Sequence, residues 1–296
     1  MPELPEVETV RAHLEPVLRG RRFERVEIDD PRLVRPYDPA EVAAELEGER
    51  VATVERRGKY LIVRFESGRA LLIHLRMTGS LRHAPAGTLE EDPYRRAVVR
   101  LDDGSDVAYR DVRRFGTWLV LEPGELEPYL DARIGSEPLD ALFTAARLGE
   151  RLANRRAPIK AALLDQRTLA GLGNIYVDEA LWRARIHPLR EARSLDRNEL
   201  RRLHRGIRGA LEHGVARRGS TLRDYALPDG ASGSMQEEFK VYGREDEPCD
   251  RCGTPIARTQ VAGRTTWFCP TCQPEDPAQA ASSSSPPSRS RRASSV

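Results

Sequence analysis

The four cysteines of the chain all fall in one C-terminal segment, as two Cys-x-x-Cys pairs. Cys249 and Cys252 form the first pair, Cys269 and Cys272 form the second, and sixteen residues separate the pairs. This spacing is typical of the two knuckles of a tetrahedral four-thiolate zinc site. Because four thiolates leave no open coordination position, we expect one structural Zn²⁺ that holds a hairpin in place, in preference to four free thiols.

The composition favours a soluble intracellular protein. The 296-residue chain has a formal net charge of +2, from 48 Lys and Arg against 46 Asp and Glu. It contains no run of about 18 apolar residues and no leader, so we expect neither membrane insertion nor secretion. In a reducing compartment, cysteines serve as metal ligands more often than as disulfides, which agrees with the zinc interpretation.

Basic residues are unevenly distributed along the chain. Arginines crowd residues 110–114, 151–167 and 201–218, whereas acidic residues gather in the N-terminal half. Such runs are either solvated faces or the electrostatic footprint of a nucleic-acid partner. Only three lysines occur among the 48 basic residues, and two of them are Lys59 and Lys160. A chain that uses arginine so widely should keep lysine where a point charge or a proton donor is needed.

Hydrophobic patterning predicts an α+β multidomain fold, with a β-rich part followed by a helical part. One helix is expected over residues 5–18, and helical patterning dominates residues 152–218. Short segments between Gly, Asp and Pro turns predict the strands of a sandwich or barrel, at 23–28, 50–56, 60–65, 70–75, 97–101, 107–110 and 117–121. The expected units are a β-sandwich with its leading helix (1–135), a linker (136–150), a helical domain (151–244), a zinc-finger β-hairpin (245–273) and a disordered tail (274–296).

The N-terminal segment, MPELPE, suggests a nucleophile. Removal of Met1 would leave Pro2 with a secondary α-amine, and such amines titrate near about pH 8, so a sizeable fraction is uncharged at neutral pH. Addition of this amine to a sugar aldehyde carbon gives an iminium ion, which acidifies the neighbouring C–H and allows a phosphate to leave. Glu3 and Glu6 are placed to move protons. Alternatively, Pro2 merely starts a surface segment and the glutamates favour the first turn of a helix.

Five segments of the chain together resemble one family. They are residues 1–9 (MPELPEVET), 57–61 (RGKYL), 74–79 (HLRMTG), 171–176 (GLGNIY) and the four-cysteine segment. In this order they are similar to the bacterial formamidopyrimidine-DNA glycosylases, base-excision-repair enzymes also called 8-oxoguanine DNA glycosylases. The resemblance runs from Met1 to Gln273. It implies an N-terminal catalytic β-sandwich domain, a helix-two-turn-helix DNA-binding domain and a zinc finger.

The resemblance also implies a bifunctional DNA glycosylase and abasic-site lyase that acts on 8-oxoguanine opposite cytosine and on formamidopyrimidines. Pro2 would attack C1′ of the deoxyribose, and β,δ-elimination would leave a one-nucleotide gap. Glu3 would assist ring opening and proton transfer, and Glu6 would support the N-terminal geometry. Lys59 would hold a phosphate and donate a proton, and Arg264, at the tip of the zinc-finger hairpin, would grip phosphates beside the damaged nucleotide. No redox cofactor is implied.

Several further residues match DNA contacts of the family. Met77, Arg113 and Phe115 stand where the family inserts a side chain into the gap left by the everted nucleotide and probes the orphaned cytosine. Phosphate contacts are predicted for His74 and Asn174, and a contact with both a phosphate and the lesion is predicted for Lys160. Without the resemblance, Met77 and Phe115 would be read as core residues, and the glycine-rich segment around Asn174 as a helix–helix corner with an Asn cap.

Two positions depart from the family pattern. Arg76 stands where many members have glycine, and the segment Tyr94–Arg96 replaces a histidine-containing stretch, so local DNA contacts should differ. Residues 219–225, running on to Gly233, resemble the flexible loop that closes over an oxidised purine. This loop favours purines over the oxidised pyrimidines handled by the related endonuclease VIII branch.

The expected partner is double-stranded DNA that contains oxidised bases or abasic sites. We expect a monomer, located in the cytoplasm with the nucleoid and not bound to a membrane. Three alternatives stay open: an endonuclease VIII-like glycosylase for oxidised pyrimidines, a non-catalytic protein that binds damaged DNA, and a zinc-ribbon adaptor that binds protein.

Overall fold

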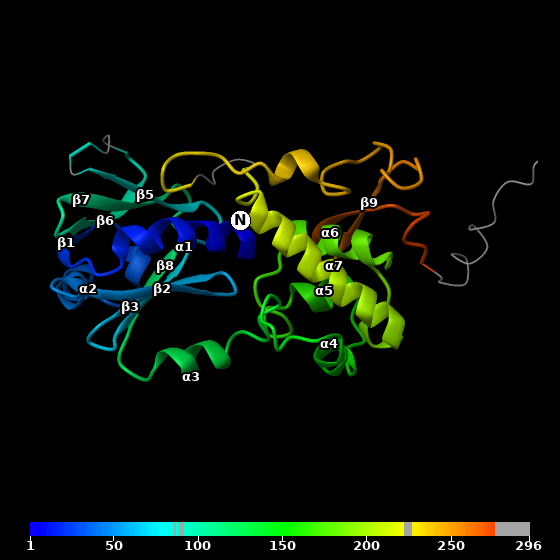
Figure 1. Ribbon diagram of the computed structural model, residues 1–296, viewed down its shortest axis with the longest axis horizontal. Coiled ribbons are helices and arrows are strands. Elements are labelled where there is room, and N and C mark those ends of the chain that lie inside the picture. Colours follow the sequence, from blue (N-terminus) through cyan, green and yellow to red (C-terminus); the bar gives the residue numbers. More distant parts are fainter. Residues whose placement is uncertain (86, 89–91, 222–226, 276–296) are drawn as a thin grey trace, which may run out of the picture.

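The computed structural model describes residues 1–85, 87–88, 92–221 and 227–275, and it has two lobes. Figure 1 shows a β-rich lobe and a helical lobe side by side, with the N-terminus between them. This arrangement confirms the α+β multidomain prediction, with a sandwich first, a helical part second and a four-cysteine hairpin last. No helix among the described residues is both long enough and apolar enough to cross a membrane.

The β-rich lobe is a sandwich of two antiparallel four-stranded sheets. One sheet has the strand order β1-β6-β7-β5 and the other β2-β3-β4-β8, and the main core lies between them. Side chains alternate between the two faces of the second sheet, so that Leu71 and Ile73 enter this core while Leu72 faces the helix α3 (Leu126–Asp131). The strands are β1 (Phe23–Ile28), β2 (Val51–Arg57), β3 (Tyr60–Phe65), β4 (Ala70–His74), β5 (Gly79–Pro85), β6 (Arg95–Leu101), β7 (Ser105–Asp111) and β8 (Thr117–Leu121).

The first helix, α1 (Leu4–Leu18), joins the two lobes. Its residues from Val7 to Leu18 pack in the core of the sandwich, whereas Leu4 packs in the core of the helical lobe. The other helical segments of the β-rich lobe and its exit are η1 (Pro31–Val34), α2 (Pro39–Leu46) and α3 (Leu126–Asp131). The start of α1 is therefore held by one domain and the rest of it by the other.

The helical lobe is built around the packing of α6 on α7. Its core already includes Phe143 and Leu148, which lie within the predicted linker 136–150. The helical segments of this lobe are α4 (Ala145–Leu152), α5 (Ile159–Leu164), α6 (Asn174–Ala184), η2 (Ala192–Ser194), α7 (Arg197–Ala216) and η3 (Met235–Glu238). Half of the predicted linker thus belongs structurally to the helical lobe, because its apolar side chains are buried there.

A two-stranded hairpin, β9 (Ala257–Val261) and β10 (Arg264–Phe268), follows the helical lobe. Ala262 and Gly263 form its two-residue turn, and both have positive φ, at 49° and 71°. This geometry matches the right-handed twist of a hairpin. The buried side chain of Gln273 accepts from the amide of Cys269 and donates to the carbonyl of Ile186, which fixes the hairpin to the helical lobe.

The sequence patterns located most elements but missed several short ones. The predicted strands all correspond to observed ones, whereas β5, α2, η1 and η3 were not predicted. In β5 only the first three residues are fully buried, so the strand lacks a sustained alternation. The predicted lesion-closing loop falls partly on residues 222–226, and nearly all of the predicted tail falls on 276–296; both lie outside the described residues.

Candidate active site at the junction of the two lobes

The first residues of the chain are anchored where the two lobes meet. Pro2 is buried, whereas Met1 before it is 48% exposed. The amide of Leu4 donates to the carbonyl of Gly171 at 3.0 Å, and its side chain is completely buried in the helical core. The position of Pro2 is therefore set by contacts with residues about 170 positions away in the sequence.

The carboxylate of Glu3 caps the N-terminus of α6. It accepts hydrogen bonds from the amides of Gly173 at 2.7 Å, Ile175 at 2.9 Å and Tyr176 at 3.3 Å. A Cβ at position 173 would lie 2.5 Å from Oε1 of Glu3, so only glycine permits this approach. Burial raises the pKa of Glu3, although the charge of Lys59 and the helix amides oppose that shift. A carboxyl in this setting is suited to proton transfer.

Glu6 connects the N-terminus to α6 and to the start of the loop after α7. Its Oε2 accepts from the amide of Glu3 at 2.9 Å, and its Oε1 accepts from the hydroxyl of Tyr176 at 2.9 Å. The amide of Ser220 donates to the same Oε1 at 2.7 Å. One buried carboxylate thus fixes three separate segments, and the supporting role of Glu6 in the reaction stays a prediction.

Lys59 lies in the turn between β2 and β3, and its side chain is buried. Burial lowers the pKa of Lys59, the carboxylates of Glu3 and Glu6 oppose this change, and the charge of Arg264 adds to it. The turn, the N-terminus and the zinc-finger hairpin thus carry charges that act on one another. An amine with a lowered pKa exchanges protons more readily near neutral pH than an ordinary lysine. Arg264 is exposed at the hairpin tip.

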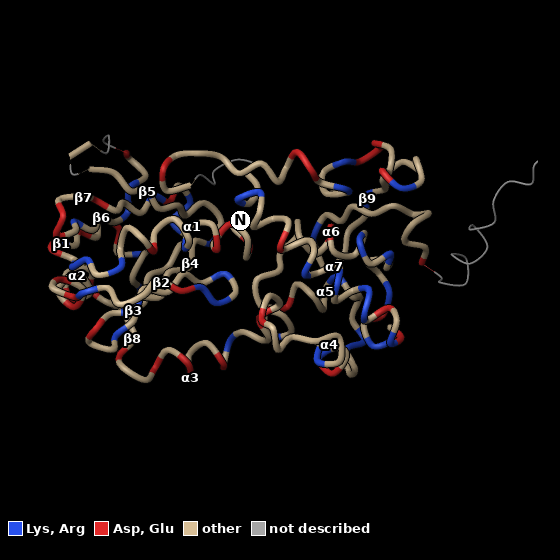
Figure 2. The backbone as a smooth tube through the Cα atoms, viewed as in Figure 1, with Lys and Arg blue, Asp and Glu red and all other residues tan. Residues whose placement is uncertain are grey.

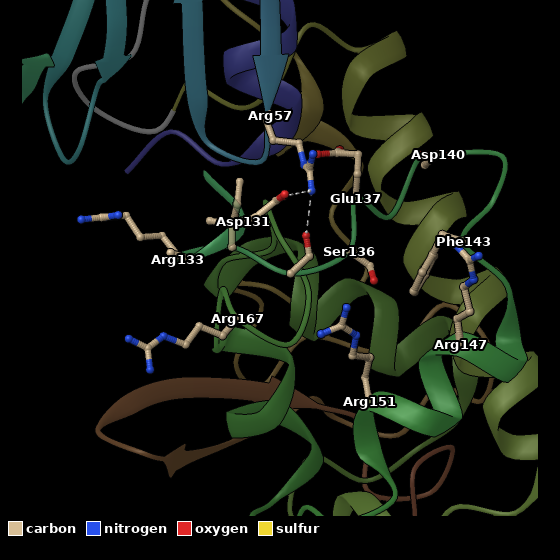
Figure 3. A pocket seen from close by; sticks show the side chains of 13 residues that line it. Arg57, Asp131, Arg133, Ser136, Glu137, Asp140, Phe143, Arg147, Arg151 and Arg167 are labelled. Atoms are coloured by element: carbon tan, nitrogen blue, oxygen red, sulfur yellow. Dashed lines mark hydrogen bonds and ion pairs between the residues drawn. The ribbon is translucent and has the colours of Figure 1, made fainter. Parts of the chain in front are cut away.

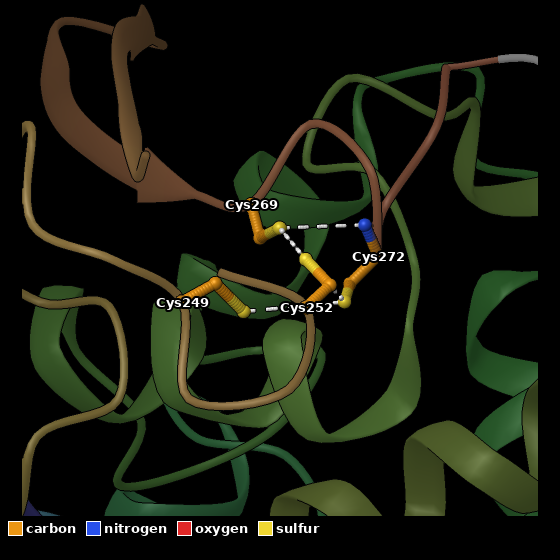
Figure 4. A group of neighbouring side chains, drawn as sticks. All are labelled: Cys249, Cys252, Cys269 and Cys272. Carbon is orange, nitrogen blue, oxygen red and sulfur yellow. Dashed lines mark hydrogen bonds between the residues drawn. The ribbon is translucent and has the colours of Figure 1, made fainter. Parts of the chain in front are cut away.

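The four cysteine sulfurs form a compact cluster (Figure 4). All four lie within 4.8 Å of one another, and the measured pairs are 3.5 Å for Cys252–Cys269, 3.6 Å for Cys252–Cys272 and 4.0 Å for Cys249–Cys272. Four thiolates at about 2.3 Å from a tetrahedral zinc ion lie about 3.8 Å apart, so the residues fit the metal. The indole of Trp182 donates to the sulfur of Cys249 at 3.4 Å, which adds an outer-shell hydrogen bond.

A buried ion pair joins the hairpin to the helical lobe. The ammonium of Lys160 lies 2.8 Å from Oδ1 of Asp178 and donates to the carbonyl of Thr265 at 3.0 Å. Asp178 accepts from the amide of Trp267 at 3.1 Å, and the side-chain amide of Asn174 also donates to Thr265, at 2.9 Å. Lys160 is 0% exposed, so its ammonium is enclosed by these partners and supports the hairpin. Its predicted DNA contact, like that of Asn174, stays a prediction.

His74, at the end of β4, is buried beside Arg76. Its Nδ1 accepts from the amide of Arg76 at 2.9 Å, so the neutral ring carries its proton on Nε2. Burial lowers the pKa of His74 to about 3, and the charges of Arg76 and Lys59 act in the same direction. Arg76 adopts a left-handed φ of 54°, a conformation that favours glycine. Glycine would adopt this backbone geometry without strain.

The predicted wedge residues occupy two neighbouring turns of the sandwich. Phe115 is 52% exposed, Arg113 is exposed, and the guanidinium of Arg113 stacks over the ring of Phe115 at 4.7 Å. Met77 is half-buried in the turn between β4 and β5.

The carboxylate that links these turns, Asp111, was not predicted from the sequence. Neither was Asp178, since a lone aspartate carries no local signal of its distant partner.

A cavity of about 540 Å³ lies below the junction, between the end of β2, the segment that leads from α3 to α4, and α4 itself. Figure 3 shows arginine side chains around it, among them Arg57, Arg147, Arg151 and Arg167. None of the predicted site residues lines this cavity. Figure 2 shows blue segments along α7 and near α4, where the arginine runs of the helical lobe lie. Five arginines and three acidic residues line the cavity, so its lining has a net positive charge, and neither Glu3 nor Lys59 is among the lining residues.

Three family models match the chain. A formamidopyrimidine-DNA glycosylase N-terminal domain matches residues 1–118, a formamidopyrimidine-DNA glycosylase H2TH domain matches 134–226, and a zinc finger found in FPG and IleRS matches 246–274. The segments that carry Glu3, Lys59, Asn174 and Arg264 all lie within these matches.

Individual proteins resemble the chain over nearly its whole length. A formamidopyrimidine-DNA glycosylase of Symbiobacterium thermophilum is 50% identical over 275 residues, which are 93% of this chain and 90% of the relative. A Lactococcus lactis FPG mutant in complex with Fapy-dG-containing DNA has a TM-score of 0.86 and 40% identity, and the match covers 92% of this chain and 100% of that one. A complex of Lactococcus lactis Fpg with DNA that contains an abasic site has a TM-score of 0.85 and 38% identity, with 92% and 99% covered.

Proposed function

Since the chain belongs to the formamidopyrimidine-DNA glycosylase family and is a base-excision-repair DNA glycosylase, we propose that it also cleaves abasic sites as a lyase, with Pro2 as the nucleophile. The substrates we assign are 8-oxoguanine opposite cytosine and formamidopyrimidines in duplex DNA. The observation that carries the proposal is the junction itself, where the buried Glu3 carboxylate next to Pro2 caps α6 and interacts with the charge of the buried Lys59.

The proposed reaction begins once Met1 has been removed, which frees the Pro2 nitrogen. The nitrogen lone pair attacks C1′, the bond from C1′ to the damaged base breaks, and the base leaves with a proton. Glu3 serves the sugar ring opening, because a carboxyl with a raised pKa can give a proton to the ring oxygen. The product is an iminium ion between Pro2 and C1′.

Strand cleavage follows from the charge of this iminium ion. Loss of a proton from C2′ expels the 3′ phosphate, and a second elimination expels the 5′ phosphate. Hydrolysis then restores the free amine. Lys59 and Arg264 hold the phosphates beside the lesion, and the neutral His74 offers its Nε2 proton to another phosphate. The burial around Glu3 and Lys59 strengthens these charge interactions by excluding water.

The structural metal we assign is zinc, held by Cys249, Cys252, Cys269 and Cys272. When bound, it supplies fold stability to the hairpin and no reactive chemistry, because four thiolates complete its coordination. The residues of the hairpin then act on DNA through Arg264. A monomeric state and a cytoplasmic, nucleoid-associated location stay predictions from the sequence.

Borohydride trapping on DNA with an abasic site tests the nucleophile. Reduction of an iminium ion leaves a stable amine, so the native chain should form a covalent adduct with the DNA. A tag that extends the N-terminus should abolish the adduct but leave DNA binding intact, whereas the same tag placed after Val296 should change neither. An N-terminally tagged protein of full trapping activity would remove Pro2 from the reaction.

Side-by-side excision of 8-oxoguanine and thymine glycol from otherwise identical duplexes tests the substrate class. We expect a higher kcat/KM for 8-oxoguanine. A reversed order would assign the chain to the pyrimidine-preferring branch with the same chemistry. Salt-dependent DNA affinity without excision of either base would indicate a protein that only binds damaged DNA.

A further inference from the structure

Phe115 and Arg113 form a preorganised projection on the sandwich. More than half of the Phe115 surface is exposed, and the guanidinium of Arg113 covers one face of its ring. Between them Arg114 has a left-handed φ of 58°, a strained conformation for a residue with a side chain. A turn with such a strained residue keeps its conformation only if contacts with the rest of the protein hold it.

Those contacts converge on one carboxylate, that of Asp111 at the end of β7. It is only 1% exposed. Its Oδ2 accepts from the amides of Phe115 at 2.8 Å and Gly116 at 2.7 Å, and its Oδ1 accepts from the amide of Arg113 at 3.2 Å. The hydroxyl of Thr78 donates to Oδ1 and accepts from the amide of Arg113 at 3.0 Å. Because Thr78 follows Met77 directly, one carboxylate holds both turns.

The backbone of Asp111 is itself fixed by the segment that departs from the family pattern. Its amide donates to the carbonyl of Tyr94 at 3.0 Å, and the buried guanidinium of Arg96 donates to its carbonyl at 2.9 Å. Behind the carboxylate, a Cβ at position 116 would lie 1.7 Å from the hydroxyl oxygen of Tyr109. The two turns are therefore closely packed, and they have little room to rearrange without losing the hydrogen bonds of Asp111.

We propose that Asp111 is a positioning residue for eversion of the damaged nucleotide, acting through the Met77 turn and the Arg113–Phe115 turn. This inference rests on the proposed function, in which those side chains fill the gap in the base stack. Eversion from duplex DNA costs stacking and pairing energy, which the inserted side chains offset only if they are held in place. Asp111 has no part in the chemistry at C1′. Its substitution should therefore slow the reaction only on a substrate in which a nucleotide must be everted from the base stack.

The test compares two substrates with the variant Asp111→Asn. The amide has one acceptor oxygen and presents an NH₂ group to backbone donors, so the turns lose part of their support. For 8-oxoguanine in a fully paired duplex, we expect single-turnover excision to fall by about 10- to 100-fold, the scale of small misplacements in active sites. For an abasic site in single-stranded DNA, where no base must be everted, we expect cleavage within about 3-fold of the native rate, since the chemistry of Pro2 is untouched.

The matched control is Asp106→Asn, the same substitution at a buried aspartate on the same strand that pairs with Arg100 and contacts neither turn. It should leave the ratio of the two rates unchanged. If Asp111→Asn does not fold, Thr78→Val removes only the hydroxyl bridge and should shift the same ratio in the same direction. Equal losses on both substrates, or no loss on either, would overturn the positioning role. Failure of the native chain on both substrates would instead overturn the proposed function.

Discussion

Loss of the Lys160 ammonium should destabilise the protein by about 3 to 5 kcal/mol, the cost of leaving a buried carboxylate without its cation. Lys160 and Asp178 are both 0% exposed, and their Nζ and Oδ1 atoms are 2.8 Å apart. In Lys160→Met the carboxylate keeps one hydrogen bond, from the amide of Trp267, and the carbonyl of Thr265 keeps the one from Asn174. The free energy of unfolding in urea, followed by circular dichroism and tryptophan fluorescence, measures this loss.

The pH dependence of this loss has a definite sign. Burial raises the pKa of Asp178, and the charge of Lys160 opposes the shift, so its removal raises the pKa further. A carboxyl whose folded pKa lies above its unfolded value binds a proton on folding, and its penalty therefore decreases as the pH falls. We expect Lys160→Met to lose more stability at about pH 8 than at about pH 5, with a slope of at most about 1.4 kcal/mol per pH unit.

Two further variants make the prediction specific. Lys160→Met/Asp178→Asn removes both charges, and the amide oxygen can still accept from Trp267, so most of the stability should return. Lys240→Met is the matched control, because Lys240 also lies 2.8 Å from an aspartate, Asp250, but with 33% and 37% of the two side chains exposed. This surface pair should contribute less than about 1 kcal/mol.

The result that refutes the reasoning is equal stability of Lys160→Met and Lys240→Met. If Lys160 acted only on a phosphate, its loss would leave unfolding unchanged and would lower the dependence of DNA affinity on salt by about one unit of slope. If it supports the hairpin, DNA affinity falls because Arg264 is misplaced, and the variant with both charges removed recovers affinity together with stability.

Three other perturbations have defined outcomes. The pKa of His74 is lowered from 6.5 to about 3 in the folded protein. Between these two pH values the unfolded chain binds more protons than the folded chain, so the free energy of unfolding falls as the pH drops through this range. The free energy of unfolding in urea should fall by about 2 kcal/mol less in His74→Gln than in the native chain when the pH is lowered from about 6.5 to about 4.5. An equal fall in the variant and the native chain would contradict this. Removal of the metal with a chelator should expose four reactive thiols and abolish DNA binding while the sandwich stays folded by circular dichroism; retained binding would contradict the role of the hairpin. Arg76→Gly should exceed Arg76→Ala in free energy of unfolding by about 1 kcal/mol, because only glycine relieves the left-handed φ, and equal values would contradict the strain.

Sequence reasoning succeeded where the signal is local. The two Cys-x-x-Cys pairs predict a four-thiolate cluster because ligand spacing within a knuckle is a property of a few consecutive residues. Strands β3 and β8 have the bounds that their apolar, β-branched patterns predict, since the pattern and the burial are features of the same short segment. Strand β5 was not predicted because only its first three residues are buried and it lies on an edge of the sheet, so its sequence shows no sustained alternation.

The sequence by itself thus determined the metal ligands, most strands and helices, the family and the residues that carry its motifs. Only the tertiary structure decided which carboxylates meet which partners: Glu3 at the start of α6, Asp178 against Lys160, and Asp111 beneath the Phe115 turn. The physical reason is distance along the chain. A buried charge is stabilised by groups that reach it only when the two lobes and the hairpin pack together, and no local pattern records where those groups will come from.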